Sequence, residues 1–101
     1  MRLSADQARA IVAVATELAG PDARVRLFGS RLNDAVRGGD IDLLVECARP
    51  IQRPLWLAAQ ISARLQRSLG ERRVDVLLTD PNTPLEPVHR VARDEGVLLG
   101  V

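Results

Sequence analysis

The sequence has few aromatic residues, a single cysteine and a single histidine. Of its 101 residues one is Phe, one is Trp and none is Tyr, so it lacks the several exposed aromatics on which single-stranded nucleic acid stacks. The lone Cys47 excludes an internal disulfide, fits a reducing compartment and is expected to be a small packing residue. The lone His89 excludes a metal site built from several histidines.

An excess of charge of one sign is also absent. The 14 Lys and Arg residues, all of them Arg, oppose 13 Asp and Glu residues and give a net charge of +1. Such a chain has no strong global field to attract nucleic acid or an anionic membrane. No apolar run approaches the ~18 residues that a membrane span requires. These absences predict a cytoplasmic protein.

Hydrophobic periodicity and turn residues divide the chain into alternating helices and strands. Helices are expected from Ser4, with Gln7 in a capping box, to residue 19, then at residues 30–36, between Pro54 and Gly70, and at residues 85–94. Strands are expected at residues 23–28, 41–46 and 73–79. This order predicts one domain over residues 1–101, of α+β or α/β class, with a three- to four-stranded mixed sheet flanked by helices.

Several apolar and basic side chains have a structural interpretation. The helix after Pro54 is predicted to bury one stripe, namely Leu55, Ala59, Ser62, Leu65 and Leu69. Phe28 is expected in the core, and so is Trp56, with a partner interface as the alternative for Trp56. The arginine group Arg64, Arg67, Arg72 and Arg73 is interpreted as a solvated face, with partner or RNA binding as the alternative.

Two aspartates stand at the start of the predicted strand at residues 41–46. Because side chains alternate along a strand, Asp40 and Asp42 project from one face at neighbouring pleats. Adjacent carboxylates repel each other, and a hard cation such as Mg²⁺ relieves that repulsion through oxygen ligands. Asp75 joins them if its strand lies beside this one, and three carboxylates can hold the two ions used in phosphoryl transfer. A lone Asp-x-Asp is usually a solvated turn, so the interpretation depends on the combination.

A Gly-Ser pair follows the strand that precedes these aspartates. Gly29 lets the backbone approach a ligand closely, and Ser30 offers a hydroxyl and a backbone N–H. Arg31 adds a cation suited to bidentate phosphate binding, and the helix expected at residues 30–36 would point its N-terminus at phosphate oxygens. Gly29, Ser30 and Arg31 are therefore predicted to bind phosphate.

The chain contains, in order, LFGSR at residues 27–31, GDIDLLV at 39–45 and VDV at 74–76, and it closes with EGVLL at 95–99. These segments resemble the minimal nucleotidyltransferases, or MNT-type domains, of the DNA polymerase beta-like superfamily. The resemblance covers nearly the whole chain. It departs from the family after Ser30, where relatives often carry a second arginine and a glycine, and this predicts fewer phosphate contacts there.

The resemblance implies an activity, a cofactor and a partner. It implies Mg²⁺-dependent transfer of a nucleoside monophosphate, with ATP as the expected donor and two ions expected. Asp40, Asp42 and Asp75 would be the catalytic, metal-binding carboxylates, and Gly29, Ser30 and Arg31 the nucleotide-binding turn. Many stand-alone MNT domains are antitoxins that pair with a HEPN-domain toxin and adenylylate it, which implies a HEPN-domain partner here.

Three functions follow from these observations. The leading one is an enzyme that adenylylates a hydroxyl of a protein or RNA. The alternative is a catalytically silent antitoxin or interaction module that neutralises a HEPN toxin by binding. Three clustered carboxylates favour the enzyme, since a pure binder has no physical need for them. An RNA-binding scaffold is the third, and the near-neutral charge and scarcity of aromatics speak against it.

Overall fold

The computed structural model describes residues 3–29, 40–70 and 72–100. Within these residues the chain forms three helices and four strands. In chain order they are α1 (Ala5–Ala19), β1 (Arg24–Phe28), β2 (Ile41–Glu46), α2 (Pro54–Ser68), β3 (Val74–Thr79), α3 (Pro87–Glu95) and β4 (Val97–Leu98). The short helix expected at residues 30–36 lies outside the described residues.

The four strands form one mixed sheet in the order β3-β2-β1-β4. Strand β1 pairs antiparallel with both β2 and β4, whereas β2 and β3 pair in parallel. Parallel neighbours need a crossover connection, and α2 provides it. The expected α+β fold, with a mixed sheet flanked by helices, is confirmed.

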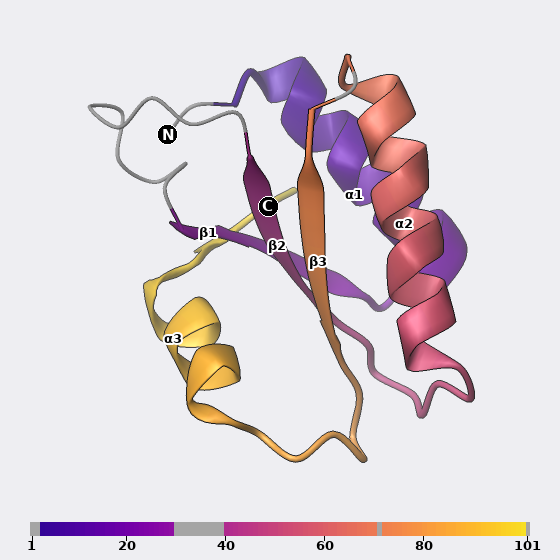
Figure 1. Cartoon of the computed structure of the whole chain (residues 1–101), viewed down its shortest axis with the longest axis vertical. Coiled ribbons are helices and arrows are strands. Elements are labelled where there is room, and N and C mark those ends of the chain that lie inside the picture. The colour runs from indigo at the N-terminus through magenta and orange to yellow at the C-terminus, as the bar shows by residue number, and fades with distance from the viewer. Residues whose placement is uncertain (1–2, 30–39, 71, 101) are drawn as a thin grey trace.

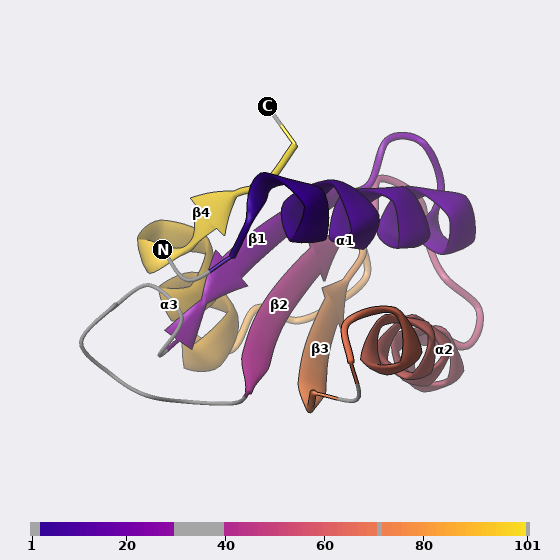
Figure 2. The ribbon, with the colours of Figure 1, turned by 90° about the horizontal axis from the view of Figure 1, so that it is seen from above.

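The two longer helices cover one face of the sheet, and α3 lies on the other side (Figures 1 and 2). The core between the sheet and the longer helices takes apolar side chains from alternate strand positions, among them Val25, Leu27, Ile41, Leu43, Val45 and Val74. The helices contribute side chains such as Ile11, Ala15, Ile61 and Leu65. The intervening strand positions therefore face the other way. In the described part of the chain, no helix is long and apolar enough to cross a membrane.

The start of α1 has the predicted capping box. The Ser4 side chain accepts a hydrogen bond from the backbone N–H of Gln7 at 3.1 Å, and the Gln7 side chain accepts one from the backbone N–H of Ser4 at 3.0 Å. These bonds satisfy amides that have no partner within the helix. The sequence pattern therefore located the beginning of α1 correctly.

On the face opposite the core, α3 packs against β1 and β2. Glu46, at the end of β2, accepts hydrogen bonds from Nε of Arg26 at 2.7 Å and from Nε of Arg93 at 3.1 Å. Ala92 of α3 and Leu44 of β2 are both buried. This ion-paired cluster joins β1, β2 and α3, and it leaves α3 anchored at the end of the strand remote from Asp42.

The predicted buried stripe of α2 is confirmed at Leu65 and Leu69 and wrong in the first half of the helix, where Leu55 and Ala59 are exposed. Leu57, Ile61 and Leu65 are the buried residues of the helix, whereas Leu55 is 87% exposed. The first turn carries three consecutive large apolar residues, so periodicity alone allows more than one stripe. Packing against α1 and β3 selects the stripe that recurs every four residues.

The two aromatic residues are also more exposed than expected. Trp56 is 49% exposed, and the guanidinium of Arg53 lies over its ring at 5.0 Å from the centroid. Phe28 projects from the sheet face opposite the core, since its neighbour Leu27 faces the core. Cys47, by contrast, is buried as expected, and burial raises the pKa of its thiol.

A carboxylate joins the two loops at the far end of the sheet. Asp80, directly after β3, accepts hydrogen bonds from the backbone N–H of Ile51 at 2.7 Å and of Asn82 at 2.8 Å. It also accepts one from Oγ1 of Thr83 at 3.1 Å. These bonds, above all the one from Ile51, hold the pKa of Asp80 below its ordinary value of 3.8. The loop that leads into α2 is thus fixed to the turn after β3.

Replacement of Asp80 by Ala is expected to lower the free energy of unfolding at neutral pH. Because the folded pKa is depressed, the carboxylate stabilises the fold above the unfolded value of 3.8, and this contribution is lost as the pH falls through the folded pKa. The difference between wild type and Asp80→Ala, measured by urea denaturation, should therefore shrink in acid. Asp80→Asn keeps one acceptor oxygen and should be milder. A pH-independent difference would contradict this account.

Candidate active site

The register of the central strands brings two of the predicted carboxylates together. Asp42 of β2 and Asp75 of β3 are direct partners across the parallel pair. Side chains at paired positions project from the same face of a sheet, here the face opposite the core. Asp40 lies just before β2 and is exposed. The condition on which the sequence prediction for Asp75 depended, adjacency of the two strands, is thus met.

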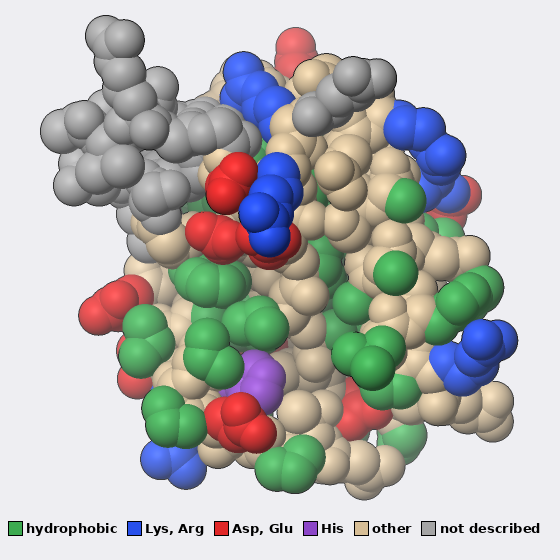
Figure 3. Space-filling view, in the orientation of Figure 1, with side chains coloured by type: hydrophobic (Ala, Val, Ile, Leu, Met, Phe, Trp, Pro, Cys, Tyr) green, Lys and Arg blue, Asp and Glu red, His purple; other side chains and the backbone are tan. Residues whose placement is uncertain are grey.

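The site lies where β2 and β3 begin, at the end of the sheet remote from α3 (Figure 1). Figure 3 shows acidic and basic side chains gathered there above a largely apolar area. The exposed large apolar side chains on or beside α3 are Leu85, Val88 and Val91. Asp40 and Asp75 are exposed and Asp42 is half-buried, so the carboxylates stand on an accessible surface.

The end of β1 approaches Asp42 closely. Phe28 pairs with Asp42 across the antiparallel strands, and the next residue, Gly29, has φ +79°. A Cβ at Gly29 would collide with Oδ2 of Asp42 and lie 3.2 Å from its Cγ. Only glycine allows both this left-handed conformation and this contact. Gly29 is thus placed beside the carboxylate of Asp42, and its role in phosphate binding stays a prediction.

Electrostatic repulsion within the cluster is not fully compensated. Partial burial raises the pKa of Asp42 above its ordinary value of 3.8, and the neighbouring charges of Asp75 and Asp40 raise it further. Arg73 opposes this shift, and its Nε lies 3.3 Å from Oδ1 of Asp75. Within the described residues, two or three carboxylates thus share the guanidinium of Arg73, which leaves net negative charge among them.

This donor set fits a divalent cation. Among the described residues, no three His, Cys, Asp or Glu side chains converge tightly enough to enclose an ion by themselves. Mg²⁺ does not need such an enclosure, since it is commonly held by one or two carboxylates together with water and substrate phosphates. The raised pKa of Asp42 and the close Gly29 backbone indicate a site shaped for a cationic ligand. Asp42 and Asp75 would be its first ligands, with Asp40 beside them.

Two of the predicted phosphate-binding residues, Ser30 and Arg31, lie outside the described residues. Their predicted role therefore stays a prediction.

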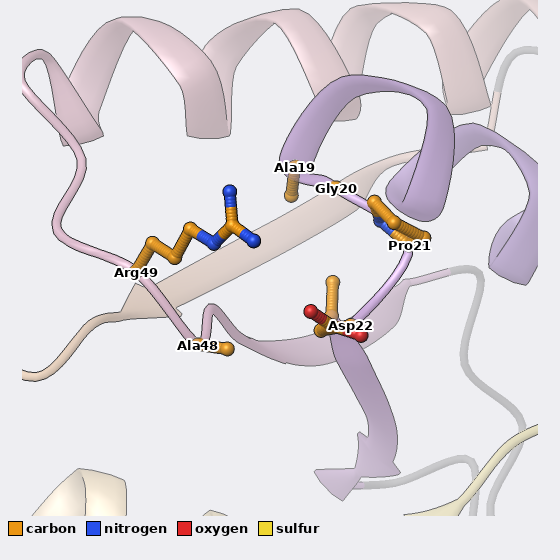
Figure 4. A pocket seen from close by; sticks show the side chains of 7 residues that line it. Ala19, Gly20, Pro21, Asp22, Ala48 and Arg49 are labelled. Carbon is orange, nitrogen blue, oxygen red and sulfur yellow. The ribbon is translucent and has the colours of Figure 1, made fainter.

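A separate hollow of about 130 Å³ lies at the opposite end of the sheet (Figure 4). It is lined by Ala19, Gly20, Pro21, Asp22, Ala23, Ala48 and Arg49. Because β1 begins and β2 ends there, this hollow is remote from the aspartates.

Comparison with protein families agrees with this geometry. Residues 9–98 match the nucleotidyltransferase domain family, and this span includes every helix and strand except the first turn of α1. The chain belongs to the nucleotidyltransferase domain family. A search of curated proteins found no match. Nucleotidyl transfer is thus the general activity of this domain, and the family uses a nucleoside triphosphate and a divalent metal.

Sequence reasoning missed one contact of the candidate site. Arg73 is exposed, as expected of a solvated face, but it also pairs with Asp75. Residues two apart project from the same side of an extended chain, so the Arg73-x-Asp75 spacing carried the signal. That signal was informative only once Asp75 was known to face Asp42.

Replacement of Gly29 by Ala should impair the site more than the fold. The left-handed conformation is expected to cost about 1–2 kcal/mol of stability, and the added methyl group should displace the carboxylate of Asp42. Gly70→Ala is the matched control, since Gly70 has φ +81° with no atom within 4 Å of an added Cβ. Both variants should show a similar loss in thermal denaturation, but only Gly29→Ala should lose Mg²⁺-induced stabilisation. Equal Mg²⁺ responses would contradict the contact.

Asp42→Asn is expected to stabilise the metal-free protein at neutral pH. Because the folded pKa of Asp42 is raised, ionisation costs stability above the unfolded value of 3.8, and wild type loses stability as the pH rises through the folded pKa. The melting temperature of Asp42→Asn should therefore exceed that of wild type at pH ~7, where an unperturbed carboxyl is ionised. The gain should vanish as the pH is lowered toward 3.8.

Mg²⁺ should reverse this order of stability. A ligand that binds only the folded state stabilises it by mass action, so wild type should gain stability on addition of Mg²⁺ while Asp42→Asn should not. Asp94→Asn, at an exposed position of α3, is the control and should respond like wild type. An Asp42→Asn variant that melts below wild type without metal would refute the proposed repulsion.

Proposed function

We propose that this nucleotidyltransferase domain transfers AMP from ATP to a hydroxyl group of a partner protein, in the presence of Mg²⁺. The observation that carries the proposal is the pairing of Asp42 with Asp75 across β2 and β3, with the Gly29 backbone against Asp42. A single carboxylate on a surface is unremarkable. Two in register beside a close glycine turn form a site for a cation and the phosphates that accompany it.

The proposed transfer is a displacement at the α-phosphorus of ATP. The hydroxyl oxygen of the acceptor forms the new P–O bond, the bond from the α-phosphorus to the bridging oxygen breaks, and pyrophosphate leaves in line. Asp75, more exposed than Asp42, is the carboxylate that we assign to accept the hydroxyl proton. Mg²⁺ bound to Asp40, Asp42 and Asp75 would neutralise triphosphate charge and lower the pKa of the hydroxyl.

A protein acceptor is favoured over RNA by the surroundings of the carboxylates. The sheet face that carries the carboxylates also carries α3, whose exposed Val88 and Val91 suit contact with apolar side chains of a protein. Among the described residues, Arg73 carries the guanidinium that pairs with this cluster, and it is engaged with Asp75. Binding of an RNA backbone by the described residues alone would need several unengaged cations.

We further propose that the partner is a HEPN-domain toxin and that this domain acts as its antitoxin, in the cytoplasm. The likeness to MNT-type domains supports this pairing, together with exposed apolar side chains on α2. Trp56 and Leu55 stand on the helical side of the sheet, away from the carboxylates. A partner seated there would leave the transfer site accessible.

Incubation with α-labelled ATP, Mg²⁺ and the protein encoded by the neighbouring gene tests the proposal. Label should appear on the neighbour with wild type and with the control Asp94→Asn, and it should be absent with Asp42→Asn and with Asp75→Asn. RNase treatment should leave the label in place, whereas loss of label on RNase treatment would move the acceptor to RNA. A stable complex without label would identify a silent antitoxin and refute transfer.

A further inference from the structure

Within the part of the chain that the structure describes, Arg73 is a basic residue beside the carboxylates that the proposed chemistry does not yet use. Its Nε lies 3.3 Å from Oδ1 of Asp75. Its backbone carbonyl accepts a hydrogen bond from the N–H of Ile41 at 2.9 Å, which fixes the backbone just before β3 against the start of β2. The guanidinium therefore extends from a fixed point beside the site.

The ion pair with Arg73 occupies Oδ1 of Asp75, an oxygen that a bound cation would need. The guanidinium of Arg73 therefore already compensates the charge of Asp75, and it also acts on Asp42. A divalent cation on Asp75 must compete with this guanidinium for the carboxylate oxygens. The pair is open to solvent, with side chains 70% and 51% exposed, so a change of rotamer is sufficient to break it.

The released guanidinium would then stand beside an incoming triphosphate. Its planar fork of N–H donors matches phosphate oxygens better than a point charge does. A triphosphate that arrives with a divalent cation brings both the competitor for Asp75 and a new partner for Arg73. The exchange leaves neither the carboxylate nor the arginine without a partner of opposite charge.

We propose that Arg73 is a nucleotide-binding residue that pairs with Asp75 in the metal-free protein and moves to the triphosphate when metal and nucleotide bind. The inference rests on the proposed function, since it needs a metal at Asp42 and Asp75. It predicts effects of opposite sign from one substitution. Without Arg73 the bare metal should bind more tightly, and the nucleotide should bind more weakly.

Mn²⁺ alone is the probe for the first effect, with free Mn²⁺ measured by electron paramagnetic resonance in the absence of nucleotide. Arg73→Gln should bind Mn²⁺ about fivefold more tightly than wild type, because the competing cation is gone. Arg72→Gln is the matched control, since no ion pair within the described chain involves Arg72. It loses the same charge one residue away and should change Mn²⁺ affinity less than about twofold.

A non-hydrolysable ATP analogue, titrated by calorimetry at saturating Mn²⁺, is the probe for the second effect. Arg73→Gln should weaken analogue binding about tenfold, and Arg73→Lys, which keeps the charge but not the fork, should fall between Arg73→Gln and wild type. Arg72→Gln should bind the analogue like wild type. Thermal denaturation of each variant verifies the fold.

The outcomes separate this inference from the proposed function. If wild type binds Mn²⁺ no better than Asp42→Asn does, both are overturned. If Mn²⁺ binding depends on Asp42 but Arg73→Gln and Arg72→Gln behave alike, only the role of Arg73 is overturned. Weaker Mn²⁺ binding by Arg73→Gln would also overturn it, because Arg73 would then position Asp75 for the metal and not compete with it.

Discussion

The parallel pairing of β2 with β3 is the constraint on which the site depends. These strands are distant in sequence and are joined by α2, whose buried stripe packs against the sheet and holds the crossover in place. The resulting register sets Asp42 opposite Asp75. A shift of one residue would turn Asp75 toward the core and turn Val74, Val76 and Leu78 away from it. The alternating apolar residues of β3 thus specify the register, and this register places Asp75 beside Asp42.

Asp80, directly after β3, and Asp42, near the start of β2, show how the surroundings of a carboxylate decide whether its charge stabilises the fold. Asp80 is surrounded by N–H and O–H donors, which lower its pKa and make its ionised form stabilising. Asp42 is partly buried and has acidic neighbours, which raise its pKa and make its ionised form costly. The first carboxylate fastens two loops. The negative charge of Asp42 is not fully compensated within the cluster, and such a perturbed carboxylate is typical of a functional position.

One face of the sheet forms the core, and the other carries the charged clusters. Side chains that point toward α1 and α2 form the core, while those that point the other way form the carboxylate site at one end and the Glu46 cluster with α3 at the other. This division lets the strand residues that carry charge vary in function without disturbing the packing. It also explains why Gly29 matters at the site: the chain leaves β1 beside Asp42, where a side chain would block the carboxylate.

The sequence by itself determined the features that depend on local periodicity. The capping box at Ser4 and the inward positions of β2 and β3 follow from spacings of two or three residues, which backbone geometry makes predictable, whereas the contact of Gly29 with Asp42 depends on the pairing of β1 with β2. Only the tertiary structure decided the register of Asp42 with Asp75, the pairing of Arg73 and the exposure of Trp56. The phase of the α2 stripe was decided in the same way, because several apolar residues near Leu55 satisfy more than one helical pattern. Each of these features depends on which distant surface a residue meets, and the order of the strands and the packing of α1 against α2 fix that surface.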